Sequence, residues 1–184
     1  GEQTFSSTGN SITVSGLSPN IEYSFKVRAL NSDGDSTVWS SSSTVRTYAQ
    51  VPNIISATGL STTSGRLVID LQDNPIGTRV SILEDGGRYV SESGELVETE
   101  DVFILSGDSI DITGLSPNTI YTFKVRAYNE DDVATEWSST LNLITHIEQP
   151  TTEITDQTKN SMTLTISGVS NIEQGTSGVY VEDI

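Results

Sequence analysis

The segment GLSPNIEYSFKVRALN, Gly16–Asn31, recurs almost unchanged as GLSPNTIYTFKVRAYN, Gly114–Asn129. The two copies lie 98 positions apart, and half of the residues at positions 11–52 are identical to those found 98 positions later. A period of this length is too long for a solenoid unit and matches the size of a small independent domain. The sequence therefore predicts a tandem of closely related domains.

Each copy of the repeated segment contains a predicted β-strand. Tyr121, Phe123, Val125 and Ala127 alternate with polar or charged residues, and this period of two is typical of a strand with one face in a hydrophobic core. Further strands are expected at Ser11–Val14, Leu67–Ile69, Ser109–Ile112 and Met162–Ile166. Turn residues separate these segments and no helical pattern occurs, so the sequence predicts an all-β, antiparallel sandwich.

The pattern Leu-x-Pro-x-x-x-Tyr-x-Phe-x-Val-x-Ala, followed by Asn, a polar loop and Trp-Ser, resembles the second half of a fibronectin type III domain. The matching residues are Leu17, Pro19, Tyr23, Phe25, Val27, Ala29 and Trp39, and then Leu115, Pro117, Tyr121, Phe123, Val125, Ala127 and Trp137. The resemblance implies tandem seven-stranded antiparallel β-sandwiches of the fibronectin type III, immunoglobulin-like kind. It also implies linkage, spacing or adhesion at the cell surface or outside the cell. The family usually carries a Trp in its second strand, where this chain has aliphatic residues, and this departure favours a microbial-type relative over the animal modules.

The repeat divides the chain into one complete and two partial domains. Residues 1–50 hold the C-terminal half of a domain, residues 51–148 a complete domain, and residues 149–184 the N-terminal half of a further domain. In the third copy the offset falls to 97, so one residue is lost near its start. Because the two partial domains are complementary, we expect residues 149–184 of one copy to complete the sandwich begun by residues 1–50 of the next.

This completion would bring Tyr23, Phe25 and Val27 of one copy against Leu164 and Ile166 of its neighbour. A head-to-tail contact of this kind does not close on itself and builds an open filament. The repeats could be separate subunits that exchange strands, or parts of one long repetitive chain. The expected partner is therefore another copy of the same repeat.

Two residue types in the repeated segment are expected to shape the turn into its strand. Pro19 and Pro117 preset the backbone of that turn and cannot continue the preceding strand ladder. By the resemblance, Tyr23 and Tyr121 each form a tyrosine corner, in which the hydroxyl bonds back to the backbone of the preceding loop. These residues are expected to be structural.

Basic residues alternate with the core residues of the same strand and are expected to face solvent. Arg28 and Arg126 should stack on Trp39 and Trp137 at the start of the following strand, forming cation–π pairs. Lys26 and Lys124 share the outward face. An exposed indole face would instead indicate a polysaccharide platform, and nothing else in the sequence supports sugar binding.

The composition excludes several partners. Of 184 residues, 9 are Lys or Arg and 25 are Asp or Glu, which gives a net charge of −16. Phosphate backbones and anionic membrane surfaces attract the opposite sign, so nucleic acid and membrane surfaces are not expected partners. The chain has no cysteine, and no apolar run approaches the ~20 residues of a membrane span. We expect an extracellular or cell-surface location.

No reaction centre is indicated, and we expect neither enzymatic activity nor a cofactor. The single histidine, His146, has no nucleophile or ligand pattern around it. The best metal candidate is formed by Asn31, Asp33 and Asp35, whose spacing resembles the first half of a calcium loop. Ser42 occupies the position of the required final acid. A polar hairpin loop is therefore the preferred interpretation.

Three functions remain open on the sequence alone. The favoured one is a structural repeat segment of an extracellular filament, stalk or surface protein. The alternatives are non-catalytic accessory modules of a secreted polysaccharide-degrading enzyme, and a ligand-binding module of an adhesin. The absence of the tripeptide Arg-Gly-Asp weakens the animal version of the adhesin.

Overall fold

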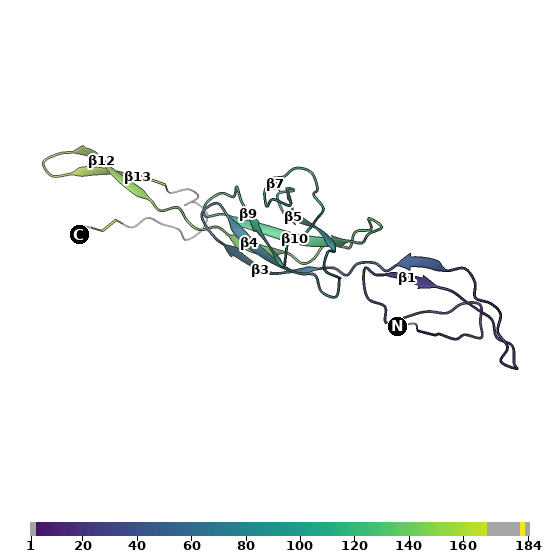
Figure 1. The fold of residues 1–184 in the computed structure, drawn as a ribbon. Coiled ribbons are helices and arrows are strands. Elements are labelled where there is room, and N and C mark those ends of the chain that lie inside the picture. Colours follow the sequence, from purple (N-terminus) through teal and green to yellow (C-terminus); the bar gives the residue numbers. More distant parts are fainter. Residues whose placement is uncertain (1–2, 169–180, 183–184) are drawn as a thin grey trace.

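The computed structural model describes residues 3–168 and 181–182, and in these residues it contains β-strands and no helix. Figure 1 shows a central sandwich with a two-stranded sheet beyond each of its ends. The N-terminal and C-terminal two-stranded sheets lie on opposite sides of the sandwich. The described part of the chain is therefore elongated rather than globular.

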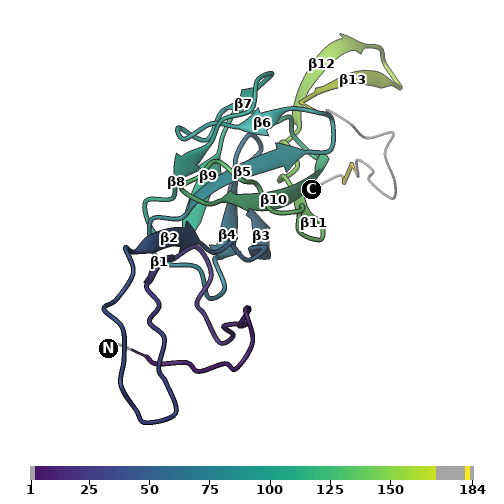
Figure 2. The ribbon, with the colours of Figure 1, turned by 90° about the vertical axis from the view of Figure 1, so that its right-hand side faces the viewer.

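The central sandwich consists of two antiparallel sheets, which Figure 2 shows from the side of the larger one. The smaller sheet has the order β3-β4-β9, with β3 at Asn53–Gly59, β4 at Gly65–Asp70 and β9 at Ser109–Ile112. The larger sheet has the order β11-β10-β5-β6-β7, and β8 also pairs with β5. Its strands are β5 (Arg79–Glu84), β6 (Tyr89–Val90), β7 (Leu96–Val97), β8 (Phe103–Ile104), β10 (Ile120–Tyr128) and β11 (Leu141–Ile144). The all-β sandwich is confirmed, and the two-residue strands β7 and β8 are additions to the seven strands expected.

The core of the sandwich forms where the alternating side chains of β10 meet the opposite sheet. Tyr121, Phe123, Val125 and Ala127 are buried, and the residues between them are half-buried, as the alternation predicted. Leu67 of β4 is fully buried against this cluster. Burying a side chain of this size stabilises the fold by about 1.5–3 kcal/mol, so this layer supplies much of the stability of the domain.

The N-terminal segment contains the strand pair β1 (Glu22–Phe25) and β2 (Ser43–Arg46). Their register repeats that of β10 and β11, since Tyr23 lies opposite Val45 as Tyr121 lies opposite Leu143. The strand predicted to continue to Ala29 ends at Phe25. The second half of β10 pairs with β5, and no described strand takes the place of β5 beside β1.

The strand predicted at Ser11–Val14 does not form, and this prediction is wrong for the single chain. Its counterpart in the sandwich, β9, forms by pairing with β4. The counterpart of β4 is β13, Met162–Ser167, which lies at the other end of the chain. Residues 11–14 therefore have no strand beside them with which to pair.

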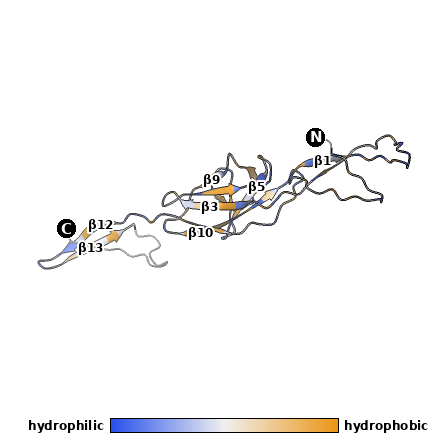
Figure 3. Ribbon diagram, turned by 90° about the horizontal axis from the view of Figure 1, so that it is seen from below, coloured by the Kyte–Doolittle hydropathy of each residue, from blue (hydrophilic) through white to orange (hydrophobic). Residues whose placement is uncertain are grey.

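The C-terminal hairpin consists of β12 (Thr151–Gln157) and β13, which confirms the strand predicted at Met162–Ile166. It repeats the β3–β4 hairpin: Thr152 lies opposite Ile166 as Ile54 lies opposite Ile69. The connecting loop is one residue shorter, which explains the change of offset from 98 to 97. Figure 3 shows hydrophobic residues on the strands of the sandwich and again on this hairpin, well away from the central core.

Candidate functional site

The turn before each repeated strand contains a tyrosine corner, as predicted. The backbone N–H of Ser116 donates a hydrogen bond of 2.8 Å to the hydroxyl of Tyr121, and Ser18 donates one of 2.8 Å to Tyr23. Pro19 lies in the turn of the first copy, and Pro117 occupies the same place in the second. The N-terminal segment therefore adopts the local structure of the complete domain although its core is incomplete.

The predicted cation–π contacts form in both copies of the repeated segment. The guanidinium of Arg126 lies 4.4 Å from the ring centre of Trp137, and that of Arg28 lies 4.7 Å from Trp39. The two tryptophans precede β11 and β2 instead of opening these strands, which corrects their predicted position. Lys124 and Lys26 also lie over the indoles, at 5.5 and 5.1 Å. Cations therefore lie over both indoles, although Trp39 remains 44% exposed.

Arg126 is held by a carboxylate that the sequence analysis did not identify. Its Nη2 lies 2.6 Å from each carboxylate oxygen of Glu100, and the hydroxyl of Tyr128 donates a 2.8 Å hydrogen bond to Oε1 of Glu100. Arg126 lies on the outward side of β10, as expected, but only 21% of its side chain is exposed, so it is more covered than the alternation predicted. Partial burial by itself would raise the pKa of Glu100, but its hydrogen bonds and the charge of Arg126 outweigh burial and lower that pKa. The loop carrying Glu100 is thereby pinned to the sheet.

The calcium candidate is a hydrogen-bonded hairpin loop. The side-chain oxygen of Asn31 accepts bonds from the backbone N–H groups of Asp33, at 3.1 Å, and Asp35, at 2.8 Å. Asn129 makes the same two bonds in a loop where Val133 replaces the third acid. Loop closure therefore accounts for the asparagine without a metal. The described residues contain no group of three or more His, Cys, Asp or Glu placed to hold a metal ion.

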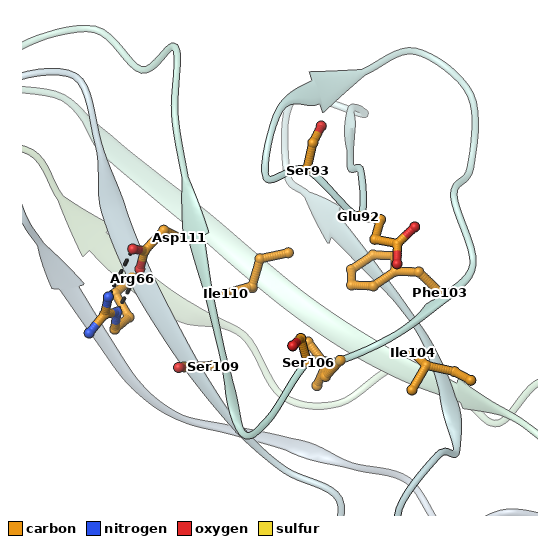
Figure 4. A pocket seen from close by; sticks show the side chains of 10 residues that line it. Arg66, Glu92, Ser93, Phe103, Ile104, Ser106, Ser109, Ile110 and Asp111 are labelled. Carbon is orange, nitrogen blue, oxygen red and sulfur yellow. Dashed lines mark hydrogen bonds and ion pairs between the residues drawn. The ribbon is translucent and has the colours of Figure 1, made fainter.

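A pocket of about 310 Å³ opens beside the smaller sheet, as Figure 4 shows. The guanidinium of Arg66 is bound to the carboxylate of Asp111 through contacts of 2.5 and 2.8 Å. Phe103 and Ile110 supply apolar walls. The lining lacks the combination of a nucleophile, a base and a group that orients the base, so the pocket does not indicate catalysis.

The most distinctive surfaces are the inner faces of the two terminal segments. Val27 of the N-terminal segment is 68% exposed, whereas its counterpart Val125 is fully buried in the sandwich. In the C-terminal hairpin, Leu164 is half-buried and Met162 is 64% exposed. These faces have the pattern of a sandwich core without the opposing sheet. We name them the unfinished faces, of residues 3–50 and of β12–β13.

One family model matches the N-terminal part of the chain. Residues 1–46 match the family model of the fibronectin type III domain. Residues 99–144 repeat this segment 98 positions later and lie in the central sandwich, so the sandwich contains the same type of segment. No curated protein matches the chain.

Several solved structures resemble the chain at low sequence identity. A two-domain fibronectin type III segment of chicken tenascin is 18% identical, with a TM-score of 0.48, and the match covers 64% of this chain and 62% of that one. Domains d3–d4 of the rat CD45 extracellular region are 20% identical, with a TM-score of 0.44 and coverages of 78% and 74%. The FN1–FN3 domains of chicken CNTN1 are 20% identical, with a TM-score of 0.40 and coverages of 71% and 42%. The chain thus spans less than half of the CNTN1 segment. Within its described residues, no helix is long and apolar enough to cross a membrane.

Proposed function

Because its sandwich and its repeated segments are of the fibronectin type III family, we propose that the chain is a structural repeat segment of an extracellular filament, stalk or surface protein. Domains of this family are generally structural or adhesive modules of cell-surface and extracellular proteins, and they are typically non-catalytic. The observation that carries the proposal is the pair of unfinished faces. Each repeats part of the complete sandwich, and the two parts come from complementary halves of the repeat.

The described strand pairs of the two partial domains repeat strand pairs of the complete sandwich. The β1–β2 pair repeats β10–β11, and the β12–β13 pair repeats β3–β4. In the complete domain, the counterpart of Leu164 is Leu67, which is fully buried. Burying each large apolar side chain in this way stabilises an assembly by about 1.5–3 kcal/mol. This burial is the gain that would favour docking of one copy's C-terminal hairpin on the next copy's N-terminal segment.

The register of this contact follows from the complete domain. There, Leu67 of β4 lies opposite Ile110 of β9, and Arg66 lies opposite Asp111. The repeat offsets place Leu164 opposite Ile12, and Thr163 opposite Thr13, in the docked pair. Residues 11–14 would then form the strand that they do not form alone. Each copy would use one end to bind and the other to be bound, which gives an open chain of copies.

A disulfide trap tests this register, because the chain has no cysteine of its own. Residues directly opposite in an antiparallel pair have Cα atoms about 4.5–5.5 Å apart, within the range that a disulfide accepts. Thr13→Cys with Thr163→Cys is expected to give a ladder of covalent multimers on a non-reducing gel after oxidation. Thr13→Cys with Thr165→Cys is the matched control, since a diagonal separation of about 7–8 Å is too long.

The results of the two cysteine pairs test the proposed assembly and its strand register separately. Multimers linked only by the control pair would show that copies assemble in another register. A chain that stays monomeric with both pairs would contradict head-to-tail completion and leave only a spacer role.

A further inference from the structure

The boundary between the N-terminal segment and the sandwich is held by specific hydrogen bonds. Gln50, just ahead of β3, makes two of them with the side chain of Asn74. The backbone N–H of Gln50 donates to Oδ1 of Asn74 at 2.8 Å, and Nδ2 of Asn74 donates to the carbonyl of Gln50 at 2.7 Å. The same Nδ2 donates to the carbonyl of Leu71 at 2.7 Å, which fixes the side chain to its own loop. Asn74 is only 7% exposed, so these bonds are shielded from water.

A second contact joins the same two units at a different point. Nδ2 of Asn20, in the turn before β1, donates a 3.0 Å hydrogen bond to Oγ1 of Thr78, just ahead of β5. The Thr78 hydroxyl donates in turn to the carbonyl of Pro75 at 2.8 Å, so its proton and a lone pair are both used. Asn20 is 3% exposed and Thr78 is 2% exposed. The contact is therefore buried and directional.

The turn itself aims the Asn20 side chain. Asn20 adopts a positive φ of 51°, which asparagine tolerates better than most residues. Its backbone N–H donates to the carbonyl of Tyr48 at 3.1 Å. Two fixed points, together with the covalent connection through the buried Pro52, leave little freedom of rotation between the units.

We propose that the contacts of Asn20 with Thr78 and of Gln50 with Asn74 form a rigid joint, which sets one orientation of each repeat relative to the next. The joint lies within one chain, so this proposal does not depend on whether copies of the chain assemble. Its function would be mechanical. Repeats joined in this way would keep fixed orientations relative to one another, so the row of repeats would resist bending.

The structure repeats the same turn at the next boundary. Asn118 corresponds to Asn20, has a φ of 47°, and donates its backbone N–H to the carbonyl of His146 as Asn20 does to that of Tyr48. The counterpart of Thr78 falls among residues 169–180, outside the described residues. The proposal therefore rests on the first joint alone.

Distances between two spin labels in the full chain test the joint. Thr44→Cys on β2 and Glu98→Cys after β7 place one label on each unit, and both positions are exposed. Labelled chains diluted into unlabelled chains report only distances within one chain. A single narrow distribution is expected for the otherwise native chain, and a broad one after Thr78→Val combined with Asn74→Ala.

Matched variants distinguish loss of the joint's hydrogen bonds from a general loss of folding. Thr78→Ser keeps the hydroxyl and is expected to keep the distribution narrow. Asn118→Ala removes the corresponding residue at the far end of the sandwich and should not change this distance. If the double variant does not fold, Thr78→Val alone is measured, with thermal unfolding of the sandwich as the check. A broad distribution in the native chain, or a narrow one that survives loss of the contacts in folded variants, would overturn the proposal.

Discussion

Phe123→Ala is the sharpest test of how the repeated segment folds. The side chain is fully buried in β10, with Glu84 of β5 on one side and Leu141 of β11 on the other. Its ring stacks on Tyr121 with the ring centres 6.4 Å apart. Truncation to alanine would leave a cavity where the two sheets meet.

The expected cost follows from this burial. Replacing a fully buried Phe by Ala lowers the free energy of unfolding by about 3–5 kcal/mol. Small domains have total stabilities of about 5–15 kcal/mol, so the variant would lose a large share. For a domain of this size each kcal/mol corresponds to about 4–8 °C, which predicts a fall in Tm of at least about 12 °C.

Thermal unfolding of the full chain, followed by circular dichroism or calorimetry, measures this loss. Phe25→Ala is the matched control, since Phe25 occupies the same place in the repeat but is only half-buried in the N-terminal segment. It should leave the main transition of the sandwich almost unchanged. No shift for Phe123→Ala would refute the assignment of inward and outward residues.

Three further expectations concern single groups. Tyr121→Phe removes the hydroxyl that accepts a hydrogen bond from the N–H of Ser116. This variant should lower the free energy of unfolding, measured by urea titration, by about 0.5–1.5 kcal/mol. An unchanged urea midpoint would argue against a stabilising tyrosine corner. Glu100→Gln should lower the Tm at about pH 7, with a loss of roughly 1 kcal/mol for this partly exposed ion pair. Folding lowers the pKa of Glu100 from its ordinary 4.5, so this stabilisation is complete above pH 4.5 and disappears as the pH falls through the folded-state pKa. A difference in Tm between the native chain and Glu100→Gln that persists in stronger acid would contradict an electrostatic origin. Millimolar calcium should not raise the Tm of the chain, and a rise that Asp33→Ala abolishes would instead establish a calcium site.

The features that the sequence predicted correctly depend on local pattern. The alternation from Tyr121 to Ala127 determines which side chains point inward, because successive residues of a strand face opposite sides. The tyrosine corner and the Arg126–Trp137 contact join residues only a few positions or one hairpin apart. Such contacts follow from strand geometry and were therefore accessible without coordinates.

The features that were missed depend on contacts between distant segments. Glu100 reaches Arg126 from a loop 26 positions away, and Asn20 meets Thr78 across 58 positions. No periodicity marks either pair. The strand predicted at residues 11–14 was wrong for a related reason. A strand needs a neighbouring strand to pair with, and the counterpart of the required neighbour is β13, at the far end of the chain. Local propensity could indicate a strand there, but only a paired edge could form it.

Head-to-tail completion of the unfinished faces is tested most directly by sedimentation velocity of the full chain over a wide range of concentrations. The account predicts a growing series of ever longer species, without a preferred closed oligomer, because each added copy presents a new unfinished face. Val27→Asp, which places a charge on that face outside the sandwich, should restore the monomer. A single monomeric species at every concentration, or one discrete closed oligomer, would contradict the account.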